Sequence, residues 1–299
     1  GTAYGSFTQP TDLGSGGGLR PYYWSSIYGG GAVKLTVSGT TTINGTITAN
    51  GGYADVGNDR KPGGGAGGSI WITTGTLAGT GIVRANGGGS ADSSYDGGGG
   101  GGGRVALYYT TDNSNLSTLS AKGGRPGGGA QYGGAGTIYT KAAAATYGDL
   151  RIDNDESSWD SSVDKVANTP ITTNVTLTNL TIADYGRLDY GRLDYANTMT
   201  ITSGLGLSGR AHLRNSGVIN ADDITISTNG WYVSQGGSTT TYNSLAWTGG
   251  IITDNGGTMN LLSVGGDLVI PAGSYLHGNV QRTFTNLTIH GVLTHTENG

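Results

Sequence analysis

Acidic side chains form the densest group of residues in this sequence that could bind an ion. The stretch 153–160 reads DNDESSWD and contains Asp153, Asp155 and Asp160. Carboxylate oxygens are the hard ligands that Ca²⁺ prefers. The stretch lacks the central glycine of an EF-hand loop and does not match the nine-residue calcium-binding repeat. Two interpretations therefore stay open: a calcium site formed by these three aspartates, or a solvated acidic loop.

A second carboxylate pair, Asp222-Asp223, lies in the phrase NADDITIS. In glycoside hydrolases two carboxyl groups act together, one protonating the leaving oxygen and the other activating water. Here no second pair follows one coil later, and the four histidines lack the clustered spacing of a metal site. We expect that the chain is not an enzyme, and that it carries no cofactor apart from the calcium considered above.

Aromatic residues supply the candidates for glycan binding, because a tyrosine or tryptophan ring can stack on a sugar while its polar tip stays in water. Tyr22, Tyr23 and Trp24 are adjacent in the sequence. The duplication DYGRLDYGRLDY at 184–195 would project Tyr185, Tyr190 and Tyr195 as a set if its copies turn alike. These six residues are where we expect a surface glycan to stack if the protein binds one.

Five asparagines fit the N-x-Ser/Thr pattern of glycosylation acceptors. A chain this rich in threonine and asparagine also produces such matches by chance. The candidates are Asn44, Asn115, Asn174, Asn179 and Asn286.

The composition excludes several classes of protein. Glycine supplies 60 of the 299 residues, charged residues are 12 %, and the net charge is −4. With no cysteine, the chain has neither disulfides nor a thiolate metal site. Its basic residues form no stripe that would bind nucleic acid. No apolar run approaches the roughly 20 residues that span a bilayer, so we expect no membrane insertion.

The elements that position these residues are predicted by internal repeats. Three segments of similar layout begin at Ala32, Ser69 and Arg104, and a partial fourth begins at Thr137. Their closing signatures, ANGG, ANGG and AKGG, recur every 36 residues, a period typical of stacked repeats. Within each repeat apolar and polar residues alternate, which indicates half-buried strands. The predicted core residues are Val33, Leu35, Val37, Ile43, Ile47, Ile70, Ile72, Leu77, Ile82, Val105, Leu107 and Ile138.

Each repeat is preceded by glycines, including the uninterrupted run of seven at 97–103. Glycine-rich runs are commonly flexible loops. Alternatively, runs from neighbouring repeats lie side by side as extended strands of polyglycine type, because no Cβ prevents their backbones from pairing. Either arrangement is compatible with the sequence.

From Asn174 onward the glycine runs stop, and apolar triplets recur with a mean spacing near 21 residues. About 3.3 Å per residue makes this one coil with three short sides. The triplets begin at Leu180, Met199, Ile224, Leu245, Leu268 and Leu287. The sequence therefore predicts an all-β fold, a parallel β-solenoid with a glycine-rich flanking layer. We expect a glycine-rich solenoid over 1–147, an acidic junction over 148–173 and a β-helix of shorter coils over 174–299.

Two groups of phrases resemble known families. NVTLTNLTIADYGRLDY and TFTNLTIHGVLTH resemble the β-helix coils of filamentous-haemagglutinin and autotransporter proteins. GGGAGGSIWITTGTLAGTGIVRANGG and GGGGGGGRVALYY resemble the glycine-rich tandem modules of very large bacterial surface proteins. The resemblance covers roughly 4–298 and implies an extracellular, cell-surface protein whose modules follow one another along the chain.

Together these features predict a non-catalytic structural protein that forms a rod or fibre. A solenoid without capping repeats exposes strand edges at both ends. The sequence starts and stops within repeat-like segments, so we expect head-to-tail partners, either copies of the chain or adjacent tandem modules. An adhesin or glycan-binding module is the first alternative, and a polysaccharide-active β-helix enzyme is the second.

Overall fold

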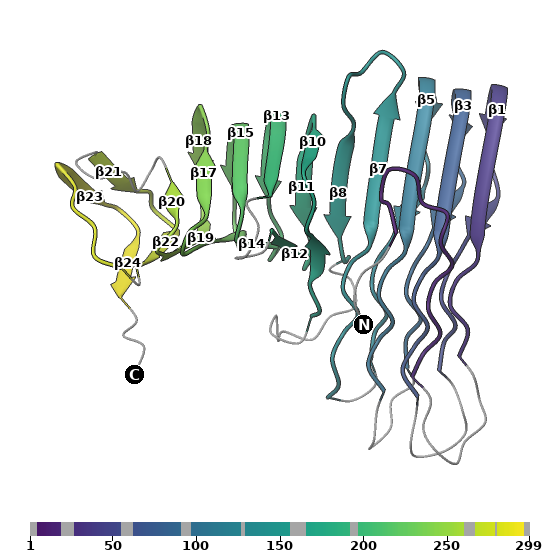
Figure 1. Ribbon diagram of the computed structural model, residues 1–299, viewed down its shortest axis with the longest axis horizontal. Coiled ribbons are helices and arrows are strands. Elements are labelled where there is room, and N and C mark those ends of the chain that lie inside the picture. The colour runs from purple at the N-terminus through teal and green to yellow at the C-terminus, as the bar shows by residue number, and fades with distance from the viewer. Residues whose placement is uncertain are drawn as a thin grey trace. The chain divides into compact units, whose positions relative to one another are not determined.

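The computed structural model describes residues 5–18, 27–54, 62–90, 97–126, 129–155, 166–191, 197–259, 267–278 and 280–295. Every regular element in these residues is a β-strand, and nearly all strand pairs are parallel (Figure 1). The prediction of an all-β fold is confirmed. The chain forms two compact units, Gly1–Thr169 and Pro170–Gly299.

The first unit repeats one long strand, one short strand and one glycine run. Its strands are β1 (Ala32–Thr42), β2 (Thr46–Thr48), β3 (Ser69–Gly79), β4 (Ile82–Arg84), β5 (Arg104–Ser114), β6 (Thr118–Ser120), β7 (Thr137–Ala142) and β8 (Asp149–Asp153). The long strands pair in the order β1-β3-β5-β7, and the short ones pair as β2-β4-β6. Equivalent residues of successive repeats are direct neighbours, as in the row Val33, Ile70, Val105 and Ile138. The predicted repeats are therefore stacked in register.

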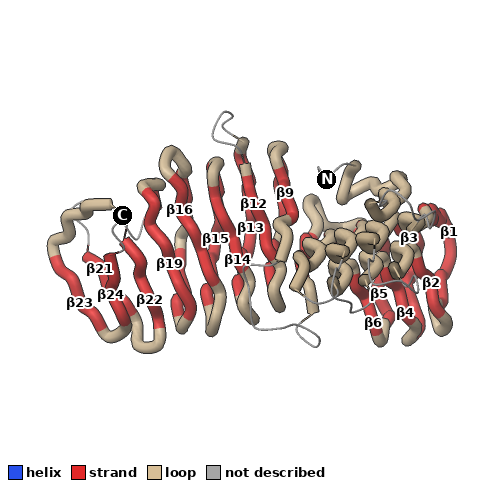
Figure 2. The backbone as a smooth tube through the Cα atoms, turned by 90° about the horizontal axis from the view of Figure 1, so that it is seen from below, coloured by secondary structure: helices blue, strands red, loops and turns tan. Residues whose placement is uncertain are grey.

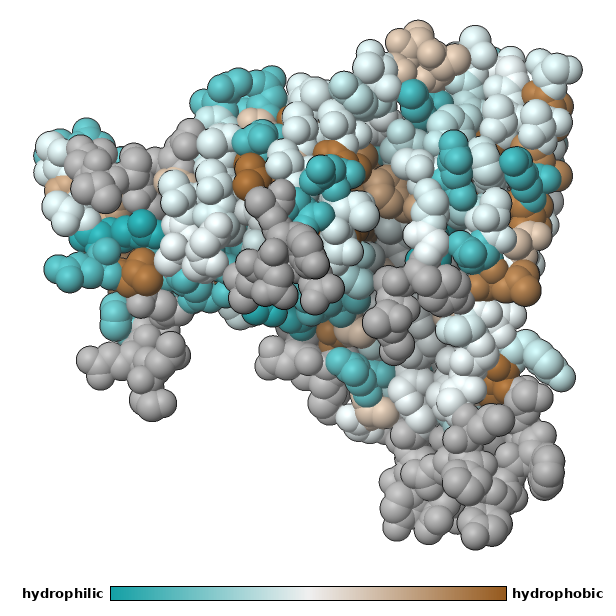
Figure 3. Space-filling view, in the orientation of Figure 1, coloured by the Kyte–Doolittle hydropathy of each residue, from teal (hydrophilic) through white to brown (hydrophobic). Residues whose placement is uncertain are grey.

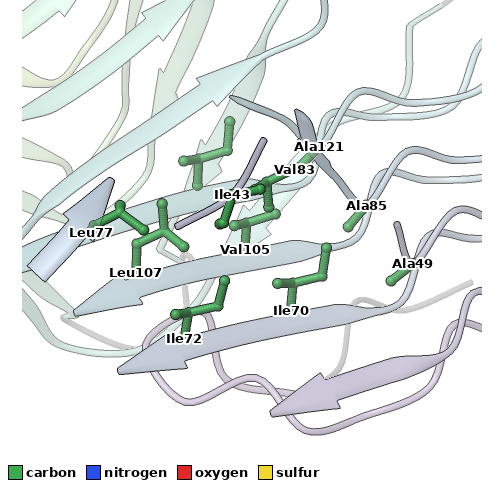
Figure 4. Packing of buried hydrophobic residues seen from close by; sticks show 11 residues of the cluster. Ile43, Ala49, Ile70, Ile72, Leu77, Val83, Ala85, Val105, Leu107 and Ala121 are labelled. Atoms are coloured by element: carbon green, nitrogen blue, oxygen red, sulfur yellow. The ribbon is translucent and has the colours of Figure 1, made fainter. Parts of the chain in front are cut away.

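The core of the first unit lies between the long and short strands (Figure 4). Seven of the predicted core residues are buried: Ile43, Ile70, Ile72, Leu77, Val105, Leu107 and Ile138. Val33, Leu35, Val37 and Ile47 are only partly buried, because β1 and β2 are edge strands with a neighbour on one side. The prediction for Ile82 is wrong. Its neighbour Val83 points inward, in register with Ile47 and Leu119.

The glycine runs lie beside one another as extended segments (Figure 1) and are hydrogen-bonded through their backbones. The amides of Gly64 and Gly67 donate to the run 97–103, at 3.0 and 2.9 Å. Those of Gly65 and Gly68 donate to the segment 49–52, at 3.0 and 2.7 Å. Every third amide thus donates to the same neighbour, as expected for an extended chain with three residues per turn. The described parts of the glycine runs are therefore extended segments bonded to one another, and not free loops.

The parallel repeats of the first unit end in a hairpin. β8 pairs with β7 antiparallel, with Tyr139 opposite Leu150, so the chain reverses where the fourth repeat would continue. The boundary between the two units, after Thr169, lies inside the predicted junction 148–173.

In the second unit the chain passes back and forth between two parallel sheets. Its strands are β9 (Thr169–Ile171), which begins at the boundary, β10 (Val175–Leu177), β11 (Leu180–Ala183), β12 (Arg187–Tyr190), β13 (Thr198–Leu207), β14 (His212–Asn215), β15 (Val218–Ile226), β16 (Trp231–Gln235), β17 (Thr239–Thr241), β18 (Ser244–Trp247), β19 (Gly250–Asn255), β20 (Thr258–Met259), β21 (Asp267–Ile270), β22 (Ser274–Gly278), β23 (Asn286–Ile289) and β24 (Val292–His295). One sheet is built around β13 and β15, and the other runs β24-β22-β19-β16-β14-β12-β9 (Figure 2). Apolar side chains on the facing sides fill the interior.

The strand register corrects the predicted series of triplets. Leu180 pairs with Leu205 and not with Met199, which pairs with Val175. The long strand β13 contains two apolar triplets separated by a register shift after Ile201, and β15 pairs with both. Each coil therefore carries two triplets on this side, and the sequence alone does not show which of them align.

Candidate functional surfaces

The predicted calcium ligands that the structure describes already have other partners. Asp153 pairs with Arg151, and its Oδ1 accepts a 2.8 Å hydrogen bond from the amide of Asp155. Asp155 pairs with Lys122, Nζ to Oδ2, at 2.7 Å. Asp160 lies outside the described residues. No group of three or more acidic or histidine side chains that could hold a metal exists within the described part of the chain. Calcium binding at 153–160 stays a prediction.

The same stretch has a role in packing the glycine strands. In successive repeats the amide of Gly51 donates to the carbonyl of Asn86, and the amide of Gly87 donates to the carbonyl of Lys122, both at 2.8 Å. The next amide in this series, that of Gly123, donates instead to the side-chain oxygen of Asn154 at 2.7 Å. Asn154 is fully buried, and its Nδ2 donates to the carbonyl of Gly133 at 3.2 Å. A side-chain amide thus takes the place of a backbone carbonyl where the repeats end.

The regular spacing of the closing signatures has a similar explanation. The alanines Ala49, Ala85 and Ala121 are buried in the core. The residue after each alanine lies at the surface end of the glycine strands, and the Oδ1 of Asn50 accepts a 2.9 Å bond from the amide of Asn86. The Oδ1 of Asn86 accepts a 3.1 Å bond from the amide of Lys122. These side chains tie each repeat to the next.

The prediction that Tyr185 and Tyr190 are glycan-stacking platforms is wrong, because both side chains are buried. Asp184 and Tyr185 both have positive φ in a tight turn closed by the amide of Gly186 on the carbonyl of Ala183, and Arg210 lies over the Tyr185 ring and donates to its hydroxyl. Tyr190 instead lies on β12 and points into the interior, where burial raises its pKa. The duplicated copies therefore do not turn alike. Tyr22, Tyr23, Trp24 and Tyr195 lie outside the described residues.

The candidate glycosylation asparagines lie at the surface, but several hold neighbouring coils together. Asn44 and Asn115 are exposed. The Oδ1 of Asn174 accepts from the amide of Thr198 at 2.8 Å, and that of Asn179 from the amide of Gly204 at 3.0 Å. The Nδ2 of Asn286, the atom that a sugar would modify, donates to Asp267 at 2.8 Å. Their modification stays a prediction.

The paired carboxylates Asp222 and Asp223 are exposed on β15 and bond to the next coil. The side-chain Nδ2 of Asn243 donates to the Asp222 carboxylate, and the hydroxyl of Ser244 donates to Asp223 at 2.5 Å. In this arrangement the pair cross-links coils through side chains.

Two unusual features of the second unit carry chemical information that the sequence did not reveal. The first is the inner row of the last described coil. Leu268 and Ile270 of β21 are 1 % and 0 % exposed, whereas Leu287 and Ile289, their register partners on β23, are 45 % and 47 % exposed. The apolar positions that β21 buries are thus open on β23.

The second feature is a row of large side chains on the outer face of the sheet β12-β14-β16-β19-β22-β24. The register places His212, Trp231, Ile251, Tyr275 and Val292 in line across five adjacent strands. His212 is 7 % exposed, and burial, with Arg187 and Arg214 nearby, lowers its pKa to about 4. Trp231 and Tyr275 are 44 positions apart in the sequence, so only the strand register shows that they belong together.

Comparison with protein-family models found no match to this chain, and comparisons with curated proteins and with solved structures found none either. Among the described residues, no helix is long and apolar enough to cross a membrane. The surface in the view of Figure 3 is mostly of intermediate hydropathy, with small separate polar and apolar areas.

Proposed function

We propose that this chain is a structural module of an extracellular fibre, a parallel β-solenoid with a polyglycine-type flanking layer, whose coils stack end to end. Three features support this proposal. Successive coils repeat in register within each unit. Glycine strands add a second hydrogen-bonded layer to the first unit. The resemblance to bacterial surface modules agrees with a place at the cell surface.

The single observation that carries the proposal is the open apolar row at β23. Leu287 and Ile289 have the positions that Leu268 and Ile270 occupy in the buried coil before them. Burial of a leucine or isoleucine side chain stabilises by about 1.5–3 kcal/mol. A further parallel strand laid on β23 would recover that free energy and pair its free edge.

The partner that fits is the β1 edge of a second copy, or the corresponding strand of an adjacent tandem module. β1 pairs only with β3 among the described strands. Its inner row, Val33, Leu35 and Val37, is partly exposed and alternates as a stacked coil requires. Because the two contacting surfaces differ, the contact is head to tail and does not close on itself, so it produces a filament.

Electron microscopy and light scattering over a range of protein concentrations test the proposal. The parent chain should form filaments or concentration-dependent oligomers, and Leu287→Lys should abolish them. Val269→Lys is the matched control, since Val269 is 48 % exposed but lies in the outer row of β21, opposite Thr288. Parent protein that stays monomeric at high concentration would contradict end-to-end stacking, as would equal effects of the two lysines.

A further inference from the structure

We propose that the outer row Trp231–Ile251–Tyr275 on β16, β19 and β22, here called the aromatic row, binds an extended polysaccharide chain. This inference goes beyond the structural function proposed above and does not depend on filament formation.

The direction and spacing of the row suit a repeating polymer. Trp231 is opposite Ile251, and Ile251 is opposite Tyr275, so the row crosses the strands. Figure 2 shows β16, β19 and β22 as neighbouring strands. Neighbouring strands are about 4.8 Å apart, which separates the two aromatic residues by about 10 Å. That distance is close to the length of a disaccharide unit in an extended β-linked chain. Two sugar rings facing the same way in such a chain could each stack on one aromatic side chain.

The Trp231 side chain is fixed in place before any ligand binds. Its Nε1 donates to the hydroxyl of Thr253 at 2.8 Å, and the His212 ring packs edge-on against it with the ring centres 4.9 Å apart. Thr253 is on the neighbouring strand, so the indole lies diagonally across β16 and β19. A fixed aromatic surface loses little conformational entropy on binding, which favours affinity.

Tyr275 offers the second platform. Its side chain is 43 % exposed and points outward, between the inward-pointing Ser274 and Leu276. Val292 continues the row on the next strand and is 40 % exposed. Aromatic rings with an apolar face and a polar tip suit a ligand that has both C–H faces and hydroxyls.

Hydrogen-bonding groups flank the aromatic row on the same face. The parallel outer row contains Arg214, which is exposed, and His277, which is bonded to Thr294. Thr253 between them is buried and accepts the bond from Trp231. The guanidinium of Arg214 can donate to sugar hydroxyls and favours a chain that carries carboxylates. A peptide strand is disfavoured here, because β16, β19 and β22 are paired on both sides and have no free edge.

Titration calorimetry with cello-oligosaccharides of two to six units, and affinity gels containing carboxymethyl cellulose, polygalacturonate or dextran, test the proposal. We expect binding to at least one extended β-linked or acidic chain, a sharp gain in affinity once the oligosaccharide spans both aromatics, and weaker binding to the flexible dextran. Tyr275→Ala should weaken binding about tenfold, since each stacked ring adds roughly a factor of two to ten.

Two further variants separate binding from folding. Trp231→Phe keeps a ring but removes the bond to Thr253, and it should weaken binding by a smaller factor. Tyr147→Ala removes a tyrosine of similar exposure, 39 %, in the first unit and should leave binding unchanged. Circular dichroism and melting establish that each variant is folded. The proposal is overturned if the folded parent binds none of these saccharides, or if Tyr275→Ala binds as tightly as the parent.

Discussion

Replacing Gly100 by alanine should destabilise the first unit, whereas the same change at the adjacent Gly101 should not. A Cβ at position 100 would lie 2.0 Å from the carbonyl oxygen of Gly65 and 2.5 Å from its carbon. At position 101 no atom lies within 4 Å. Neither glycine has a positive φ, so the two substitutions differ in packing and not in backbone strain.

The magnitude follows from the hydrogen bonds that must break. An acceptable carbon–oxygen contact of about 3.3 Å requires the two glycine strands to separate by about 1.3 Å. That displacement disrupts the two bonds that join these strands, from the amide of Gly64 to the carbonyl of Gly98 at 3.0 Å and from the amide of Gly67 to the carbonyl of Gly101 at 2.9 Å. Each buried group left without a partner costs about 1–3 kcal/mol, so we expect a loss of about 2–4 kcal/mol for Gly100→Ala.

Gly101→Ala should instead stabilise by about 0.4–1 kcal/mol, because alanine restricts the unfolded chain and meets nothing in the folded one. Denaturant unfolding of both variants measures the difference, and amide exchange across 97–103 shows whether the glycine strands have loosened. In the parent protein we expect the amides of 97–103 to be protected from exchange about as strongly as those of Ile70 to Thr74, because the glycine strands are packed. If both variants match the parent, or if Gly101→Ala is the less stable one, the packed-strand explanation is refuted.

Three other predictions concern the core, the end of the glycine layer and the buried histidine. Ile72→Asp should prevent folding, because Ile72 is 1 % exposed and a buried carboxylate without a partner is costly; a soluble, cooperatively melting variant would disprove this. Asn154→Ala should cost about 2–4 kcal/mol in a melting experiment, because the amide of Gly123 and the carbonyl of Gly133 lose their bonds to Asn154. Asn50→Ala, at an exposed position, should cost about 1 kcal/mol. The pKa of His212 is lowered from 6.5 to about 4, so the unfolded state binds the proton first as pH falls, and stability should drop by about 2 kcal/mol between pH 7 and pH 5. His212→Gln should reduce that pH dependence, and an unchanged slope in the variant would contradict the assignment.

Local patterns in the sequence were sufficient to predict the strands and most of the core. Alternation around Ile70 and Ile72 identifies the buried face of β3, since side chains alternate along any strand. The same rule fails at Ile82-Val83, where two apolar residues are adjacent and only the pairing with Ile47 decides which one points inward. The pattern also does not show that Leu180 aligns with Leu205 and not with Met199, because β13 carries two equivalent apolar triplets.

The candidate sites were harder to predict because they depend on contacts between coils. Tyr185 and Tyr190 share a five-residue motif, yet one is in a left-handed turn and the other is on an inward-facing strand position. The sequence marks Asp153 and Asp155 as candidate metal ligands, and only the structure shows that Arg151 and Lys122 pair with them. Trp231 and Tyr275 form a row only through two strand pairings.

The positions of the alanines within the glycine runs follow from the three-residue turn of the packed strands. In the run 97–103, position 101 is the one where a Cβ meets nothing, and at Gly98, three residues earlier, the nearest atom would be 3.2 Å away. The run 63–68 has Ala66 where the same period predicts room, three residues after Gly63, whose added Cβ would meet its nearest atom at 3.3 Å. At the other described positions of this run a Cβ would approach a backbone oxygen to between 1.9 and 2.3 Å. The run 133–136 likewise has Ala135 three residues after Tyr132, with glycine on both sides. Glycine is thus required at two positions in three, and a small side chain is tolerated at the third, so the interruptions in the runs obey the same geometry as the runs themselves.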